Sequence, residues 1–350
     1  MSKIKVAILA ATGAVGQRFV QLLEDHPWFE VAALTGSERT VGQTYAEGCR
    51  WILPEPMPDY ARQMKVVPTA PGFEAALAFS ALPTEQAKDL EPELAAAGYV
   101  ISSNASALRP WPDVPLLIPE VNPDHTALID AQQRQRGWKG FVVTNPNCTS
   151  TGLTIAFKAL QDAFGLRRAF VMSMQAVSGA GYPGVASLDI LDNVIPYVGG
   201  SEEDKVENEP RKMLGRLSDQ HIELAPVQIS AHTNRVGVTD GHTVCTSVEF
   251  DRPATPAEVV ECLANFQAPA PVRALPSCPP RVIEVRSEPD RPQPRKDRLA
   301  GKGMTTVVGR VRPDPLFHIK FVVFSHNTIR GAAGASILNG EWLVAQGRVK

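Results

Sequence analysis

Short apolar runs separated by amphipathic stretches dominate the first 150 residues. Continuous apolar runs, which predict strands buried on both faces, occupy residues 5–9, 31–34, 65–67, 78–80, 99–102, 116–118 and a run ending at residue 144. Apolar residues at helical spacing predict helices at residues 15–24 and 85–97. Strands that alternate with helices predict a mostly parallel sheet, whose ligand lies beyond the carboxyl ends of the strands.

The pattern changes after residue 150. Alternating apolar and polar residues predict strands at 168–177, 221–230, 235–238, 242–250, 282–285, 305–311 and 318–324. Helices are predicted at 153–160, 202–214, 256–266 and 328–345. Strands of this type are expected in a sheet with one exposed or dimer-facing side. Two proline-rich basic segments, 268–280 and 289–302, are interpreted as ordered crossing loops, with flexible linkers as the alternative.

These elements predict an α/β fold with two domains. Residues 1–149 would form a Rossmann-like dinucleotide-binding domain, completed by a C-terminal helix at 328–350. Residues 150–327 would form an α+β catalytic and dimerisation domain. The chain of 350 residues is long enough for two such cores.

The turn after the first strand carries a glycine pattern typical of dinucleotide binding. It reads Ala10-Ala-Thr-Gly13-Ala-Val-Gly16, with alanine at the first of the three expected glycine positions. The flanking strand and helix strengthen the prediction. After the second strand the chain places Ser37-Glu38-Arg39-Thr40. A guanidinium flanked by hydroxyls suits a 2′-phosphate and favours NADP, whereas Glu38 leaves NAD open and a solvated turn is the structural alternative.

Cys148 lies in the motif Asn145-Pro-Asn-Cys148-Thr-Ser150, between an apolar run and an amphipathic one. This position predicts a cysteine in the first turn of a helix, where the dipole and free N–H groups favour the thiolate. Thr149 and Ser150 are candidate caps, and Gly165 is a candidate stop. The alternative is that Cys148 is a small buried apolar residue.

A thiolate beside a nicotinamide cofactor can attack an acyl carbon and pass through a thioester while hydride is transferred. Such chemistry requires a proton donor or acceptor and groups that bind anions. Arg235 and His242 flank the turn signal Asp240-Gly241 and are candidates for these tasks. His232 is an equally good candidate on its chemistry alone.

Composition narrows the class of protein. A charged fraction of 21% and a net charge of −2 favour neither nucleic acid nor a membrane as the main partner. The five cysteines lie far apart and show no metal-finger spacing, which predicts a reducing, cytoplasmic compartment with neither disulfides nor a bound metal. The basic N-terminus resembles a secretory signal, but its apolar run ends too early, so we interpret it as a buried strand.

Taken together, the motifs resemble those of the aspartate-β-semialdehyde dehydrogenase family, specifically its archaeal and fungal branch. The resemblance covers essentially the whole chain, in order, through Ala11-Thr-Gly-Ala-Val-Gly16, Ser37-Glu-Arg-Thr40, Asn145-Pro-Asn-Cys-Thr-Ser150, Gln175-Ala-Val-Ser-Gly-Ala-Gly181, Asp192-Asn-Val-Ile-Pro-Tyr197, Asn234-Arg-Val236, Asp240-Gly-His-Thr243, Pro292-Gln-Pro-Arg295 and His326-Asn-Thr-Ile-Arg-Gly-Ala-Ala-Gly334. It implies that NADPH reduces aspartyl phosphate to the semialdehyde, with release of phosphate, on the route to lysine, threonine and methionine. It also implies a homodimer or a homotetramer.

The resemblance assigns roles to individual residues. It implies Cys148 as nucleophile and His242, rather than His232, as acid and base. The substrate residues that it implies are Arg109, Asn147, Gln175, Glu202, Lys205 and Arg235. The implied cofactor residues are Thr12, Gly13, Ala14, Val15, Ser37, Arg39, Thr40, Ser178, Gly179 and Asn327. The chain departs from the family pattern at Ala10, where a glycine is usual, and the neighbouring Glu203 competes with Glu202.

Three alternatives remain open on the sequence. A malonyl-CoA reductase on the same scaffold would keep the cysteine, the histidine and NADPH. Acetylglutamyl-phosphate and glyceraldehyde-phosphate dehydrogenases share the mechanism but resemble the motifs less. A noncatalytic NADP-binding sensor would not need Cys148, His242, Arg235 and Arg109 together.

Overall fold

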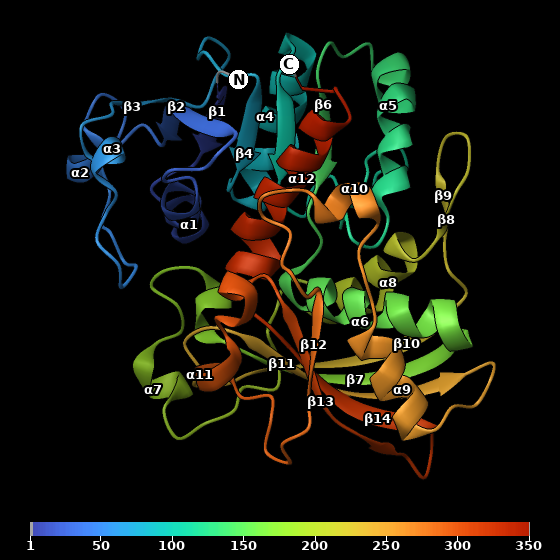
Figure 1. Cartoon of the computed structure of the whole chain (residues 1–350). Helices are drawn as coiled ribbons and strands as arrows, with labels where there is room; N and C mark the ends of the chain where they lie inside the picture. Colours follow the sequence, from blue (N-terminus) through green and yellow to red (C-terminus); the bar gives the residue numbers. More distant parts are fainter. Residues whose placement is uncertain (1–2, 350) are drawn as a thin grey trace.

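The computed structural model describes residues 3–349 and holds two six-stranded sheets, one above the other in Figure 1. The first sheet is entirely parallel, with the strand order β3-β2-β1-β4-β5-β6. Its strands are β1 Ile4–Leu9, β2 Phe29–Gly36, β3 Val66–Pro68, β4 Leu77–Ser80, β5 Val100–Ser103 and β6 Phe141–Thr144. This order is that of a doubly wound dinucleotide-binding sheet, as predicted.

Helices cover both faces of the first sheet. Val6 and Ile8 of β1 pack in a core with α1 and α12, whereas Ala7 and Leu9 point to the other face, toward α4. This alternation explains why the strands are apolar throughout. The helices around this sheet are α1 Ala14–Leu22, α4 Thr84–Ala97, α5 Leu128–Arg136 and, from the far end of the chain, α12 Gly334–Ala345.

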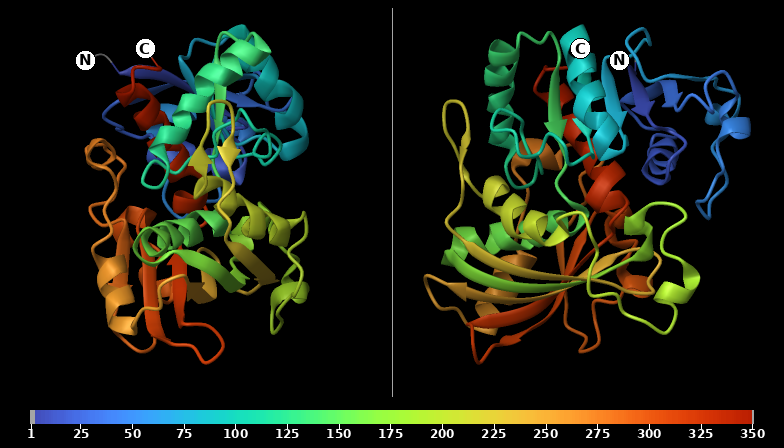
Figure 2. Two further views of the ribbon diagram at one scale, coloured as in Figure 1. Left: turned by 90° about the vertical axis from the view of Figure 1, so that its right-hand side faces the viewer. Right: turned by 180° about the vertical axis from the view of Figure 1, so that it is seen from behind.

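The second sheet is mixed, with the order β10-β7-β11-β14-β13-β12. Its strands are β7 Leu166–Gln175, β10 Gln228–Arg235, β11 His242–Phe250, β12 Ile283–Arg286, β13 Thr306–Pro313 and β14 Ile319–Ser325. The long helix α6 Cys148–Phe164 lies on the side that faces the first sheet, as Figure 2 shows, and α8 Glu202–Met213 and α9 Pro256–Ala264 pack beside it.

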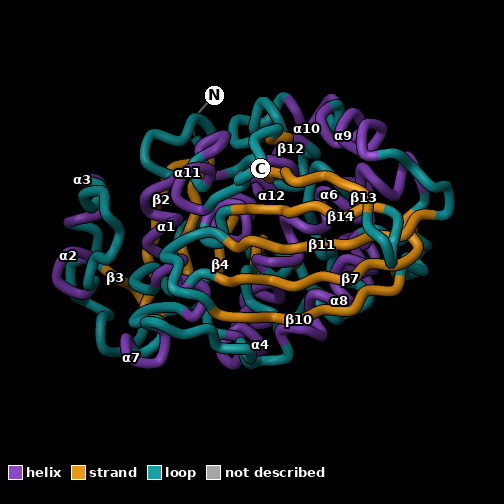
Figure 3. The backbone as a smooth tube through the Cα atoms, turned by 90° about the horizontal axis from the view of Figure 1, so that it is seen from below, coloured by secondary structure: helices purple, strands orange, loops and turns teal. Residues whose placement is uncertain are grey.

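The lower face of the second sheet is turned toward the viewer in Figure 3, with α6 and α8 behind it. Phe170 on this face is 38% exposed, and Met172 and Cys245 are partly exposed. The alternation of these residues with buried ones fits the expectation of a sheet with one uncovered side.

Shorter elements complete the chain. They are α2 Tyr45–Gly48, α3 Asp59–Arg62, α7 Ser187–Ile190, β8 Arg216–Leu217, β9 Ile222–Glu223, α10 Ala270–Arg273, α11 Pro294–Asp297, the 3₁₀ turns Pro123–Ala127, Val177–Ala180 and Ala300–Gly303, and the π-helical turn Ile329–Ala333. The two proline-rich segments contain α10 and α11. Within residues 3–349, no helix has the length and apolar character needed to cross a lipid bilayer.

Three of the predicted strands, at 116–118, 221–230 and 235–238, are wrong. Residues 116–118 form only a single bridge, from Leu116 to Thr144. The side chain of the buried Asn122 takes the neighbouring backbone groups instead, because its oxygen accepts from Ile118 N and its amide donates to Leu116 O. The strands expected at 221–230 and 235–238 are replaced by the short β9 and by β10, which ends at Arg235.

Candidate active site

Cys148 opens α6 directly after the short link from β6. Asn147 caps this helix, and its side-chain oxygen accepts from the backbone N–H groups of Thr149 at 2.9 Å and Ser150 at 3.2 Å. Thr149 and Ser150 are therefore capped residues, and the prediction that they cap the helix is wrong. Gly165 follows the last turn with φ of +71°, as predicted for a stop.

His242 is the histidine that contacts the thiol. Its Nε2 lies 3.1 Å from Sγ of Cys148, and its Nδ1 accepts a hydrogen bond of 3.1 Å from the backbone N–H of Ala176. Because Nδ1 accepts, we assign the proton of the neutral ring to Nε2, which donates to the sulfur. His232 lies instead on the exposed face of β10, with its ring against Phe170.

The thiol and the imidazole are both held neutral. Burial raises the pKa of Cys148 to about 12, and the charge of Glu202 adds to this effect against Arg109 and Arg235. Burial lowers the pKa of His242 to about 3, with Arg235 contributing. The backbone at the helix start lowers the pKa of the thiol, as predicted, but burial outweighs it, so the predicted net lowering of the pKa is wrong for this structure. A helix dipole contributes at most about 2 kcal/mol, whereas burial shifts a pKa by up to about 3–5 units, or several kcal/mol.

Arg235 ends β10 and is almost fully buried. Its Nη1 donates to the carbonyl oxygen of Ala176 at 2.7 Å, so one residue's backbone holds both Arg235 and His242. Gly179 lies over them, since a Cβ at that position would be 2.9 Å from Nη1 of Arg235 and 3.2 Å from the His242 ring. Only glycine fits there without a displacement of these two side chains.

Glu202 contacts three polar side chains of the site. Its Oε1 accepts from the side-chain amides of Asn147 at 2.8 Å and Gln175 at 3.0 Å, and Lys205 lies 4.0 Å from Oε2. Glu203 accepts instead from the backbone N–H of Thr233 on β10. Of the two neighbouring glutamates, Glu202 is the one that the structure places at the site.

Arg109 reaches the site from the loop after β5. Its Nη1 lies 2.9 Å from Oε1 of Glu209, and its Nη2 donates to Asn104 O at 2.7 Å, while its buried Nε has no partner among the described residues. Glu209 is a residue of the site that was not predicted from the sequence. The signal was present, because Glu202, Lys205 and Glu209 lie three and seven residues apart on a predicted helix and so share one face.

A cavity of ≈ 570 Å³ joins these groups to the first sheet. The predicted residues that line it are Ala14, Val15, Arg109, Asn147, Cys148, Ser178, Gly179, Lys205 and Asn327. Asn327 links two walls of the site, because its side chain accepts from Gly241 N and donates to the hydroxyl of Ser178. Gln175, Glu202, Arg235 and His242 adjoin the cavity through the contacts described above.

In the turn after β1, the start of α1 packs directly against the backbone of the turn. Ala10 adopts φ of +55°, a conformation that glycine takes more easily, and a Cβ on Gly16 would lie 2.3 Å from the Ala10 carbonyl oxygen. Thr12 and Gly13 precede the first turn of α1. Ser37 and Arg39 are exposed in the turn after β2, where the Thr40 hydroxyl donates to Ser37 O. None of these three residues lines the cavity that contains Cys148.

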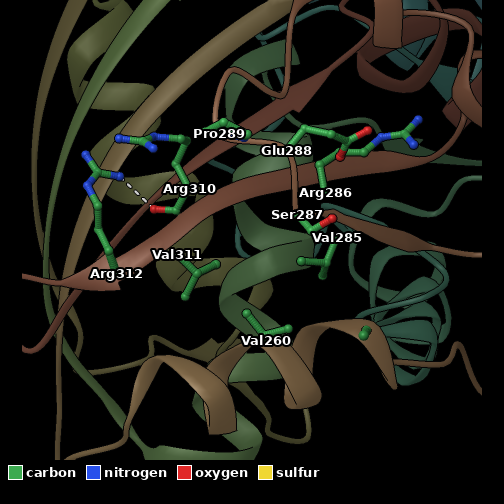
Figure 4. Close-up of a pocket in the computed structure, with 10 residues that line it drawn as sticks. Val260, Val285, Arg286, Ser287, Glu288, Pro289, Arg310, Val311 and Arg312 are labelled. Carbon is green, nitrogen blue, oxygen red and sulfur yellow. Dashed lines mark hydrogen bonds between the residues drawn. The ribbon is translucent and has the colours of Figure 1, made fainter.

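A second cavity, of ≈ 410 Å³, lies beside β12, β13 and α9 (Figure 4). Two of its arginines are already bonded, since Arg286 pairs with Glu284 and Asp297 and Arg312 donates to the carbonyl oxygen of Arg310. It holds none of the groups around Cys148, so it is not the candidate active site.

Comparisons with protein families, curated relatives and solved structures all identify similarity to semialdehyde dehydrogenases. Residues 5–129 match the model of the semialdehyde dehydrogenase NAD-binding domain, and residues 157–330 match that of the semialdehyde dehydrogenase dimerisation domain. The chain is 52% identical to aspartate-semialdehyde dehydrogenase of Archaeoglobus fulgidus over 98% of its own length and 99% of the relative's. For the Cryptococcus neoformans protein of the same name, the identity is 46% and the coverage is 99% of both. A crystal structure of aspartate semialdehyde dehydrogenase with NADP from Candida albicans superposes with a TM-score of 0.91 at 39% identity, covering 99% of this chain and 100% of that one.

Proposed function

Because the chain belongs to the semialdehyde dehydrogenase family, we propose that it is an NADP-dependent aspartate-semialdehyde dehydrogenase. It reduces aspartyl 4-phosphate to aspartate 4-semialdehyde and releases phosphate, in lysine, threonine and methionine biosynthesis. The observation that carries this function is the contact of 3.1 Å between Cys148 Sγ and His242 Nε2, with Arg109 and Arg235 close enough for their charges to act on the thiol. The relatives give no support to the malonyl-CoA reductase alternative, which we do not propose.

One end of aspartyl phosphate carries an α-carboxylate and an amino group, and the other end carries the phosphate. The site has a candidate partner for each of these groups. We assign Arg235 to the α-carboxylate and Glu202 to the amino group, with Asn147 and Gln175 holding Glu202 in place. Arg109 and Lys205, which line the cavity, are assigned to the phosphate. Anion-binding groups at both ends would hold the acyl carbon over Sγ.

Cys148 is the proposed nucleophile. Its sulfur forms a bond to the acyl carbon while the carbon–oxygen bond to phosphate breaks, which leaves a thioester. The proton of the thiol is transferred, in net terms, to the departing phosphate. NADPH, when bound, supplies hydride to the acyl carbon. Breakage of the carbon–sulfur bond then releases the semialdehyde, and the thiolate regains a proton.

His242 acts at the oxygen of the acyl carbon. With Nδ1 occupied by Ala176 N–H, Nε2–H is available as a hydrogen-bond donor to negative charge on that oxygen. The lowered pKa of His242 supports donation from a neutral ring rather than from an imidazolium ion. Thus we assign His242 a catalytic role that does not require it to gain a proton.

The chain fits an NADP cofactor at the first sheet. The close packing of Gly16 on Ala10 and the space left over Gly179 are features that only glycine supplies there. The exposed turn after β2 is assigned to the 2′-phosphate. The proposed cofactor residues are Thr12, Gly13, Ala14, Val15, Ser37, Arg39, Thr40, Ser178, Gly179 and Asn327.

We propose an assembly of identical subunits, which the match to a dimerisation domain supports, and expect a homodimer or a homotetramer. The proposed domain division is 1–149 with 328–350, and 150–327, supported by the packing of α12 against β4 and β5. Five free cysteines support a cytoplasmic location.

The direct test mixes the protein with NADP, aspartate semialdehyde and phosphate, and follows NADPH absorbance. NADPH formation that depends on phosphate is expected. Substitution of malonyl-CoA and NADPH in a parallel reaction should give no NADPH consumption. The proposed function is wrong if semialdehyde gives no phosphate-dependent NADPH.

A further inference from the structure

Glu209 holds two parts of the active site with one carboxylate. It lies on α8 and is almost fully buried. One oxygen is 2.9 Å from Nη1 of Arg109, and the other accepts from the backbone N–H of Asn147 at 2.5 Å. Asn147 is the residue before Cys148, so the carboxylate connects the start of the catalytic helix to the arginine from the loop after β5.

Another buried ion pair shows why this arrangement is unusual. Arg330 and Glu120 are completely buried, and both oxygens of Glu120 accept from the same guanidinium, at 2.7 and 2.9 Å. That pair joins two points of the fold, and neither residue lines the cavity that contains Cys148. Its arginine, like Arg109, has a buried Nε without a partner among the described residues. Glu209 instead divides its oxygens between two groups that border the thiol.

The guanidinium of Arg109 has five N–H groups, and only two of them have partners among the described residues. Glu209 and Asn104 O bind its two Nη atoms, whereas its buried Nε has no partner among residues 3–349. Arg109 also lines the cavity that contains Cys148.

We propose that Glu209 is a positioning residue that orients Arg109 toward the phosphate and fixes its distance from Cys148. This inference rests on the proposed function. Glu209 bonds to the side chain of Arg109 but only to the backbone N–H of Asn147, whose side chain holds Glu202. Its effect on substrate binding should therefore be largest at the phosphate end.

Glu209→Gln tests the idea, because the amide keeps the shape but can accept from only one of the two donors. In the phosphorylating direction we expect the KM for phosphate to rise about tenfold or more, as for loss of a charge-assisted bond, while the KM for semialdehyde changes less than about twofold. Adding Glu209→Gln to Arg109→Lys should raise the phosphate KM little further, because the two residues act as a unit. Equal changes in both KM values, or additive effects in the double variant, would overturn the proposal.

Glu207→Gln is the matched control. Glu207 lies on the same helix and accepts from the backbone N–H of Ala231 in β10, away from the thiol. Its variant should leave both KM values unchanged. If Glu209→Gln does not fold, Glu209→Asp supplies the same test, since the shortened carboxylate cannot reach both donors.

Thermal unfolding with inorganic phosphate alone, without cofactor, separates this proposal from the proposed function. Phosphate should raise the Tm of the wild-type protein, and Glu209→Gln should need about tenfold more phosphate for the same rise. An identical response in the two proteins would refute the role of Glu209. A wild-type protein that responds to phosphate but forms no NADPH would refute the proposed function instead.

Discussion

Gly331 lies so close to Cys148 that a Cβ at residue 331 would be 2.7 Å from the Cβ of the cysteine and 2.8 Å from its Cα. Gly331 belongs to the π-helical turn that precedes α12. The position of the thiol is therefore set partly by the absence of a side chain on a segment nearly two hundred residues away in the sequence.

Gly331→Ala should displace Cys148, because the obstructing atoms are backbone and Cβ rather than the end of a flexible side chain. We expect kcat to fall by about tenfold or more, since small displacements of a reacting atom are costly, with the Kd for NADP changed less than about threefold. Gly237→Ala is the control, because a Cβ there meets only Ile190 O at an ordinary 3.7 Å. Wild-type kcat in Gly331→Ala would show that the turn yields without moving the thiol.

The free protein should alkylate slowly at Cys148 near neutrality. The pKa of this thiol is raised to about 12, so the folded protein keeps its proton at pH values where an ordinary cysteine ionises. The rate of reaction with iodoacetamide should rise about tenfold per pH unit from pH 7 to beyond pH 9. Cys148→Ser supplies the background from the other four cysteines and should abolish turnover while retaining NADP binding. A rate that levels off below pH 8 would mean that the thiolate is already formed.

Arg39→Ala should weaken NADP far more than NAD. Only NADP offers a 2′-phosphate, and a charge-assisted bond to it is worth roughly 1.5–3 kcal/mol, or about 10–150-fold in KM. The measurement is the ratio of kcat/KM for the two cofactors. Equal losses for both would show that Arg39 only supports the turn after β2.

Arg235→Lys and Arg109→Lys should affect opposite ends of the substrate. Lysine lacks the planar two-bond grip of arginine, so Arg235→Lys should raise the KM for semialdehyde and Arg109→Lys that for phosphate, each by about tenfold. The ratio of the two KM changes within each variant is the decisive quantity, because kcat can fall in both. Parallel changes of both constants would contradict the two-ended assignment.

Much of this architecture is predictable from local pattern. The apolar runs predict the strands of the first sheet, and the motif around Cys148 predicts its place at a helix start. The exceptions depend on tertiary contacts. The side chain of Asn122 forms hydrogen bonds with the backbone of residues 116–118, where the sequence predicts a strand. At the thiol, burial by distant segments raises the pKa of Cys148 more than the helix start lowers it. The partners of Glu209 lie 62 and 100 residues away, so spacing indicates its face but not its contacts.

The two bonds made by Ala176 have a consequence for how the site tolerates change. The N–H and C=O of one residue orient His242 and Arg235, so the proposed hydrogen-bond donor to the acyl oxygen and the proposed carboxylate-binding group are held by the same main-chain residue. A main-chain group persists through almost every substitution, and proline is the exception because it has no N–H. The tautomer of His242 is therefore fixed by a backbone N–H group, which replacement of the Ala176 side chain by any residue other than proline leaves in place.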